Sequence, residues 1–76
     1  MISLDTLPQR TVARVHSICD SVVSNRLMEM GFYPDQKLEI LGKAPFGDPL
    51  AVRIGNSTVM LRLTEAQCVS VVEENR

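Results

Sequence analysis

Short runs with a period of two cover most of the chain. In the first of them, residues 11–18, Ala13 and Val15 fall on one side of an extended segment and Arg14 and His16 on the other. The same period recurs in four further segments, which are residues 36–43, 49–54, 58–63 and 68–73. A period of two with many β-branched residues is typical of half-buried strands, so we expect five strands.

One segment follows a helical period instead. Val23, Leu27 and Met30 recur at i, i+4 and i+7 and form one apolar stripe. Asp20 precedes the stripe and can accept hydrogen bonds from the first free amides of a helix. We therefore expect one helix over residues 21–30, inserted between the first two strands.

Glycines and short polar segments mark where these elements end. Gly31 follows the apolar stripe, where a left-handed helix cap favours glycine. Gly55-Asn56 separates two alternating runs, which is typical of a two-residue hairpin. Residues 64–67, Thr-Glu-Ala-Gln, resemble a capping box that opens a single helical turn. Before the first strand, a short lead-in is expected to dock Leu4 and Leu7 on the core.

These elements fit one small fold. A chain of 76 residues has room for a single domain, which we assign to residues 1–76. The pattern predicts a mainly β protein, a five-stranded SH3-like barrel with one inserted helix and a short helical turn before the last strand. Closing the sheet would remove edges that so small a chain cannot otherwise cover.

Charge and composition exclude several classes of protein. The 8 basic and 9 acidic residues are spread along the chain and give a net charge of −1. Nucleic-acid binding needs clustered basic residues, so we expect none. The apolar runs are too short to span a membrane, and the N-terminus lacks the pattern of a signal peptide. We therefore expect a cytoplasmic protein without membrane insertion, in which Cys19 and Cys68 are reduced thiols.

The segment Ala-Pro-Phe-Gly-Asp-Pro at residues 44–49 is the most distinctive in the chain. Each proline fixes φ and removes a donor, so the loop is rigid and cannot join the sheet ladder. No nucleophile, base or ligand cluster accompanies it, which indicates recognition rather than catalysis. Asp48 either caps local amides or pairs with a basic group of a partner. The candidate partner-binding residues are Met28, Phe32, Tyr33, Ala44, Pro45, Phe46, Gly47, Asp48 and Pro49.

Three motifs in this chain resemble those of the FeoA family. They are Arg26 to Asp35, Ala44 to Leu50 and Leu61 to Ala66, in the family's order, and the resemblance covers essentially the whole chain. The motif residues to which we assign a structural role are Arg26, Leu27, Met30, Gly31, Pro34, Leu61, Arg62, Glu65 and Ala66. Arg62 and Glu65 either form a surface ion pair or orient the turn before the last strand. Arg10 and Asp35 depart from the family, which has glycine at both positions.

The resemblance implies a cytosolic SH3-like protein that assists FeoB, the membrane transporter for ferrous iron with a cytosolic GTP-binding domain. The leading hypothesis is a non-catalytic module that binds this domain and is thereby recruited to the inner face of the membrane. A donated arginine, such as Arg26 or Arg53, is the route by which it would stimulate GTP hydrolysis.

Metal binding is the alternative function, in a soluble protein that binds or senses ferrous iron. His16 and Cys19, with Asp20 adjacent and Cys68 elsewhere, are ligand types that ferrous iron and zinc accept. A structural site needs four ligands in paired spacings, and the chain has 1 His. We therefore predict no metal site and no cofactor.

A third interpretation is a detached C-terminal domain of a metal-dependent repressor, because those domains are also SH3-like.

Overall fold

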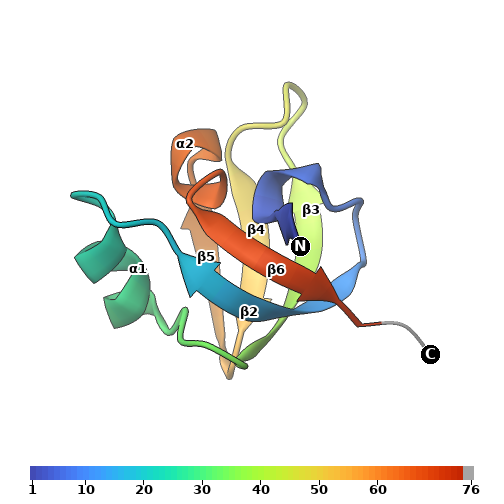
Figure 1. Ribbon diagram of the computed structural model, residues 1–76. Helices are drawn as coiled ribbons and strands as arrows, with labels where there is room; N and C mark the ends of the chain where they lie inside the picture. The colour runs from blue at the N-terminus through green and yellow to red at the C-terminus, as the bar shows by residue number, and fades with distance from the viewer. Residues whose placement is uncertain (75–76) are drawn as a thin grey trace.

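The computed structural model describes residues 1–74 and consists mainly of strands (Figure 1). The strands are β1 (Ile2–Ser3), β2 (Val12–Ile18), β3 (Lys37–Lys43), β4 (Leu50–Ile54), β5 (Ser57–Leu61) and β6 (Val69–Glu73). The helices are a 3₁₀ turn (Leu4–Thr6), α1 (Ser24–Met30) and α2 (Leu63–Ala66). In this part of the chain no helix is long and apolar enough to cross a membrane.

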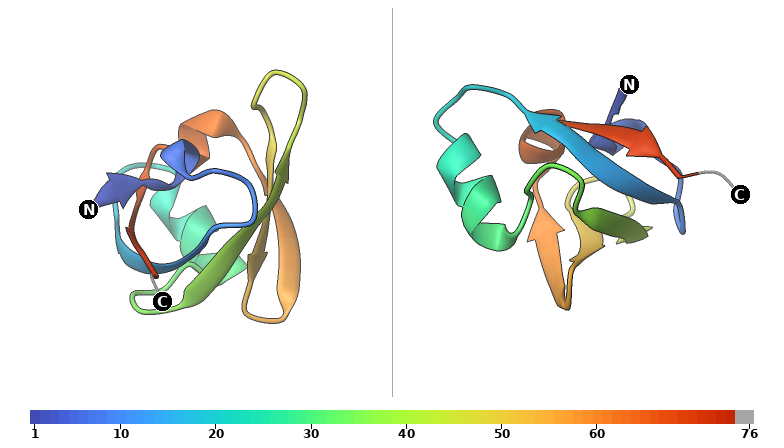
Figure 2. Two further views of the ribbon diagram at one scale, coloured as in Figure 1. Left: turned by 90° about the vertical axis from the view of Figure 1, so that its right-hand side faces the viewer. Right: turned by 60° about the horizontal axis from the view of Figure 1, so that its bottom comes forward.

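The strands form one antiparallel sheet in the order β1-β6-β2-β3-β4-β5. The expected closed barrel of five strands is wrong in two respects. A sixth strand, β1, pairs with β6 and places Ile2 opposite Val71. Within residues 1–74 no pairing joins β1 to β5, so the sheet bends round its core without closing (Figure 2). Instead, α2, which follows β5, contacts the 3₁₀ turn that follows β1.

The alternation along the strands is confirmed. Ala13 and Val15 are buried, whereas Arg14 and His16 are exposed. Two side chains of the lead-in, Leu4 and Leu7, are buried in the core as expected. The wholly buried side chains are Leu4, Leu7, Ala13, Leu27, Phe32, Ile40, Val52, Leu61, Ala66, Val69 and Val71.

Helix α1 is shorter than expected and is capped by a different residue. It begins at Ser24, not at Ser21, and its N-cap residue, Val23, makes no side-chain capping hydrogen bond. Ser21 takes the role expected of Asp20, because its Oγ accepts from the amide of Val23 at 3.3 Å and its carbonyl accepts from the amide of Ser24 at 3.1 Å. The helix ends as expected at Gly31, with φ of 109°.

The hairpin and the second helix differ in how well they match expectation. Ile54 lies opposite Ser57, so the two-residue turn is confirmed, with φ of 59° at Gly55 as a type II′ turn requires.

The capping box of the second helix begins two residues earlier than the sequence predicted. Helix α2 has Arg62 at its N-cap and Glu65 at the third helical position.

Both departures from the family motifs occur at left-handed backbone positions. Arg10 has φ of 70° and Asp35 has φ of 71°. The turn at Asp35 therefore survives without glycine, because Asp tolerates this region better than most residues. Arg10 enters β2 in the same conformation, and its amide donates to Ile40 O at 2.7 Å. A long side chain at positive φ is strained, which glycine would not be.

Candidate partner-binding site

The loop of residues 44–49 joins β3 to β4 and projects beyond the sheet at the top of Figure 1. Its base is closed by a hydrogen bond from Ala44 N to Pro49 O at 3.0 Å. A turn within it is closed by Gly47 N and Ala44 O at 2.7 Å, and Gly47 has φ of 81°. At the tip, the side chain of Phe46 is 97% exposed. The loop therefore presents one aromatic ring that contributes nothing to the core.

Asp48 anchors this loop to α2. Its Oδ1 accepts from the amide of Leu63, the first residue of α2, at 3.0 Å. The same oxygen lies 3.9 Å from Nε of Arg62. Asp48 therefore has a structural role, in which it caps a helix 15 residues away and not the amides of its own turn. Its pairing with a basic group of a partner stays a prediction.

Glu65 connects α2 to α1. Its carboxylate is buried, with Oε1 accepting from the amide of Arg62 at 2.9 Å and Oε2 lying 3.1 Å from Nε of Arg26. The surface ion pair considered for Arg62 and Glu65 is therefore not formed, since Arg62 offers Glu65 its backbone amide and pairs through its side chain with Asp48. Residues from all three motifs thus meet at the N-terminus of α2.

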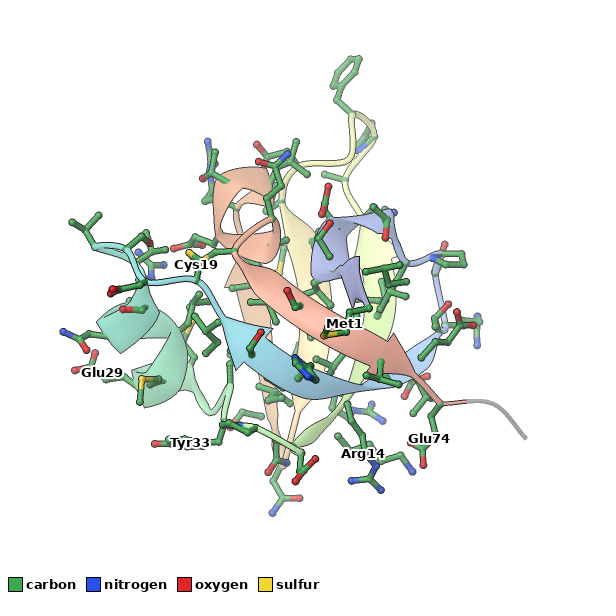
Figure 3. The ribbon with its side chains drawn as sticks, in the orientation of Figure 1. Met1, Arg14, Cys19, Glu29, Tyr33 and Glu74 are labelled. Carbon is green, nitrogen blue, oxygen red and sulfur yellow. A yellow bond between two sulfur atoms is a disulfide. The ribbon has the colours of Figure 1, made fainter. Side chains whose placement is uncertain are left out.

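The surface of α1 offers a second candidate area. Met28 is 43% exposed and next to the exposed Glu29 in the sequence, and Tyr33 is 51% exposed. Glu29 and Tyr33 both lie at the lower left of Figure 3. Phe32, however, is wholly buried, so its assignment to the partner surface is wrong.

Phe32 is buried because of how α1 ends. The amide of Gly31 donates to Met28 O at 3.0 Å and that of Phe32 to Leu27 O at 3.1 Å, which together make a Schellman motif. In this motif the residue after the glycine packs on the last turn of the helix, and both Phe32 and Leu27 are buried. The sequence signal that would have placed Phe32 in the core is an apolar residue directly after the capping glycine.

The structure does not bring the two candidate areas together. The 44–49 loop lies at the top of Figure 1 and α1 at the lower left, with α2 between them. Phe46 and Met28 therefore cannot be parts of one small contact. Each area is linked to α2, the loop through Asp48 and the helix through Arg26.

The two arginines considered as donors to a GTPase are both engaged. Arg26 pairs with Glu65, and Arg53 lies 3.7 Å from Glu39 through its Nη1 atom. A donated guanidinium would first have to break one of these pairs.

The residues considered as metal ligands are arranged differently from expectation. Cys19 and Cys68 form a disulfide, so the expectation of two reduced thiols is wrong for this structure. His16 Nδ1 lies 3.3 Å from Ser17 Oγ on the exposed side of β2. Over residues 1–74, no three His, Cys, Asp or Glu side chains are grouped so that they could hold a metal ion. Sequence reasoning missed the disulfide because nothing in the spacing of the two cysteines indicates that they meet.

The chain is a small, bent antiparallel sheet that carries an anchored, projecting apolar loop. The model of the FeoA domain matches residues 2–73. The chain therefore belongs to the FeoA family, as the three motifs indicated, and this family is associated with ferrous iron transport.

Solved structures support this assignment. FeoA from Stenotrophomonas maltophilia, an SH3 domain protein solved with zinc, is 34% identical with a TM-score of 0.84, covering 95% of this chain and 91% of its own. A FeoA-like protein from Clostridium acetobutylicum is 32% identical with a TM-score of 0.92, covering 99% of this chain and 88% of its own. The SH3-like fold is thus shared with the family. A comparison with curated proteins found no match.

The same fold occurs in part of a manganese-dependent transcriptional repressor. That protein is 24% identical with a TM-score of 0.86, and the match covers 95% of this chain but only 36% of the repressor. At this level of identity the likeness concerns the fold alone.

Proposed function

We propose that the protein is a non-catalytic accessory factor for ferrous iron uptake that binds the cytosolic GTP-binding domain of a FeoB-type transporter. Such a protein acts in the cytoplasm and reaches the inner face of the membrane through its partner. The observation that carries the proposal is the 97% exposed side chain of Phe46 on a loop anchored at its base.

The energetic argument begins with Phe46. An exposed phenyl ring leaves a large apolar area in water, and this position lends the fold no compensating burial. Aromatic side chains that enter a partner's pocket are among the residues that dominate binding energy. Because Asp48 and the two loop hydrogen bonds hold the backbone, little conformational freedom is lost on binding. The loop is therefore suited to insert Phe46 into an apolar pocket.

The α1 surface is the second contact area in this proposal. Met28 and Tyr33 are half-exposed apolar or amphipathic side chains. Helix α1 lies on a different side of α2 from the loop (Figure 1). A partner that contacts both areas must span α2. The family resemblance supplies the identity of the partner, and the exposed residues supply the contact areas.

Binding of the purified protein to the soluble GTP-binding domain of the transporter tests the proposal. Phe46→Ala should leave the melting temperature nearly unchanged and weaken binding by about tenfold or more, as loss of a hot-spot side chain does. Val72→Ala is the matched control, because Val72 is an exposed apolar residue on β6, 50% exposed. Equal binding of both variants and the wild type would refute the role of the loop.

Uptake of ferrous iron in cells separates partner binding from metal handling. Phe46→Ala and Met28→Glu should reduce uptake, since each alters one contact area. His16→Ala should not, because His16 lies outside both areas. Loss of uptake with His16→Ala and none with Phe46→Ala or Met28→Glu would favour the alternative of metal binding.

A further inference from the structure

The disulfide between Cys19 and Cys68 joins two segments that the backbone already holds together. Their Cα atoms are 5.0 Å apart, although the residues are 49 apart in the sequence. The amide of Cys19 donates to Cys68 O at 2.8 Å, next to the paired residues Ile18 and Val69 of β2 and β6. The sheet therefore keeps the two sulfurs near each other whether or not they are bonded.

The two sulfurs differ in their access to solvent. Cys19 is exposed, at the left of Figure 3, whereas Cys68 is only 8% exposed. Ser21 Oγ lies 3.3 Å from the sulfur of Cys19 and 3.8 Å from that of Cys68. A hydroxyl at this position can donate a hydrogen bond to a thiolate on either residue, and the thiolate is the reactive form of cysteine. Cys19 is exposed enough to act as the attacking thiol, and Cys68 lies close enough to it to act as the resolving thiol.

The disulfide lies where it restrains α1. Cys19 comes before the exposed residues 20–22 that lead into α1, and Val22 there is 97% exposed. Cys68 comes just after α2, and its amide donates to Glu65 O at 3.0 Å. The disulfide and the pair of Arg26 with Glu65 thus tie α1 to α2 at two points. Opening the disulfide removes the covalent part of the tie at the N-terminal side of α1, whereas the hydrogen bond from Cys19 N to Cys68 O holds only the backbone at Cys19 itself.

We propose that Cys19 and Cys68 form a reversible dithiol–disulfide site that reacts with low-molecular-weight disulfides, and that its redox state sets the order of α1 and of the segment before it. This inference goes beyond the proposed function and does not depend on it. A disulfide that is exposed on one side and held by the sheet in both states is suited to open and close without unfolding the protein.

The reaction is thiol–disulfide exchange. The Cys19 thiolate attacks one sulfur of a small disulfide such as glutathione disulfide, whose S–S bond breaks and releases one thiolate. The Cys68 thiolate then attacks the Cys19 sulfur of the mixed disulfide and releases the second thiolate. Two electrons pass from the two cysteines to the small disulfide, and the two cysteine protons go to the released thiolates. A small thiol reverses both steps.

Titration of the reduced protein with mixtures of reduced and oxidised glutathione tests the chemistry. After alkylation of free thiols, mass spectrometry should show the intramolecular disulfide forming and reopening as the ratio changes. Cys68→Ser should accumulate one glutathione on Cys19, because no resolving thiol is present. Cys19→Ser is the matched control and should gain glutathione much more slowly, because Cys68 is buried.

Amide hydrogen exchange tests the effect on α1. The oxidised protein should exchange more slowly than the reduced protein over residues 19–30 and equally elsewhere. A double variant, Cys19→Ser with Cys68→Ser, should match the reduced protein in both buffers.

Three results would overturn the proposal. The first is a reduced wild-type protein that forms no intramolecular disulfide with glutathione disulfide. The second is a reduced protein that unfolds, since the bond would then be a structural staple. The third is a rate of amide hydrogen exchange over residues 19–30 that is the same in the oxidised and reduced proteins.

Discussion

The pair of Arg26 with Glu65 gives the sharpest prediction for stability, because only one of its charges is buried. The side chain of Glu65 is 6% exposed, whereas that of Arg26 is 61% exposed. Arg26→Gln keeps most of the side-chain length but removes the positive charge. The carboxylate of Glu65 is then left buried, with the Arg62 amide as its remaining hydrogen-bond donor among the described contacts.

The burial of the carboxylate decides the size of the effect. Exposed ion pairs contribute about 0–1 kcal/mol, whereas removing one partner of a fully buried pair costs about 3–5 kcal/mol. Water reaches the Arg26 side of this pair, which places the expected loss between these limits, at about 1–3 kcal/mol. For a domain of this size that loss lowers the melting temperature by about 5–20 °C.

A matched pair in the same chain provides the control. Arg53 lies 3.7 Å from Glu39, with the two side chains 57% and 34% exposed, so both charges are accessible to water. Arg53→Gln should therefore cost less than about 1 kcal/mol. Thermal and urea unfolding of the two variants, followed by circular dichroism, compares them directly.

Combining Arg26→Gln with Glu65→Gln tests the cause. The double variant holds no buried charge, and the glutamine oxygen can still accept from the Arg62 amide. It should be more stable than expected from the sum of the two single changes. The reasoning is refuted if Arg26→Gln melts within about 2 °C of Arg53→Gln, or if the two changes at Arg26 and Glu65 are additive.

Three further changes test other parts of the structure by thermal unfolding. Arg10→Gly should stabilise the protein by about 0.5–1 kcal/mol, because Arg10 has a left-handed backbone with φ of 70°, which glycine adopts without strain. The gain should exceed that of Asp35→Gly, and a less stable Arg10→Gly protein would contradict the strain. Leu27→Ala should cost about 2–5 kcal/mol, since Leu27 is wholly buried, and a melting temperature near that of the wild type would show that α1 does not dock on the sheet. Asp48→Ala should cost about 1–2 kcal/mol of stability, because it removes the cap on α2. Asp48→Asn keeps an acceptor oxygen and should cost less, so equal losses of stability in the two variants would refute the capping role.

The strands were predictable because their signal is local. A period of two reports which side of a sheet each residue occupies, and Leu50, Val52 and Ile54 are buried as their spacing indicated. The left-handed turns were predictable for the same reason, since Gly31 and Gly55 mark positions that favour glycine. β1 was missed because two residues carry too little periodicity to be recognised.

The contacts of the candidate site were less predictable because they join distant residues. Asp48 caps a helix 15 residues away, and Cys19 meets a cysteine 49 residues away. Hydrophobic period and cap rules describe neighbours within a few residues and contain no information on such pairs. The 44–49 loop was found from its prolines, but that Asp48 anchors it to α2 follows only from the folded arrangement.

The shortness of α2 explains why these distant contacts matter. A helix of 4 residues cannot be stable alone, because helix nucleation is costly and every residue lies near an end. Its first two free amides, those of Arg62 and Leu63, are satisfied by carboxylates from Glu65 and Asp48. The loop therefore orders α2 while α2 holds the loop, and Arg26 extends this mutual support to α1. The 44–49 loop, α2 and α1 are therefore connected by these side-chain contacts. A partner that binds at Phe46 and on α1 would contact two ends of this connected set, although the two areas lie apart on the surface.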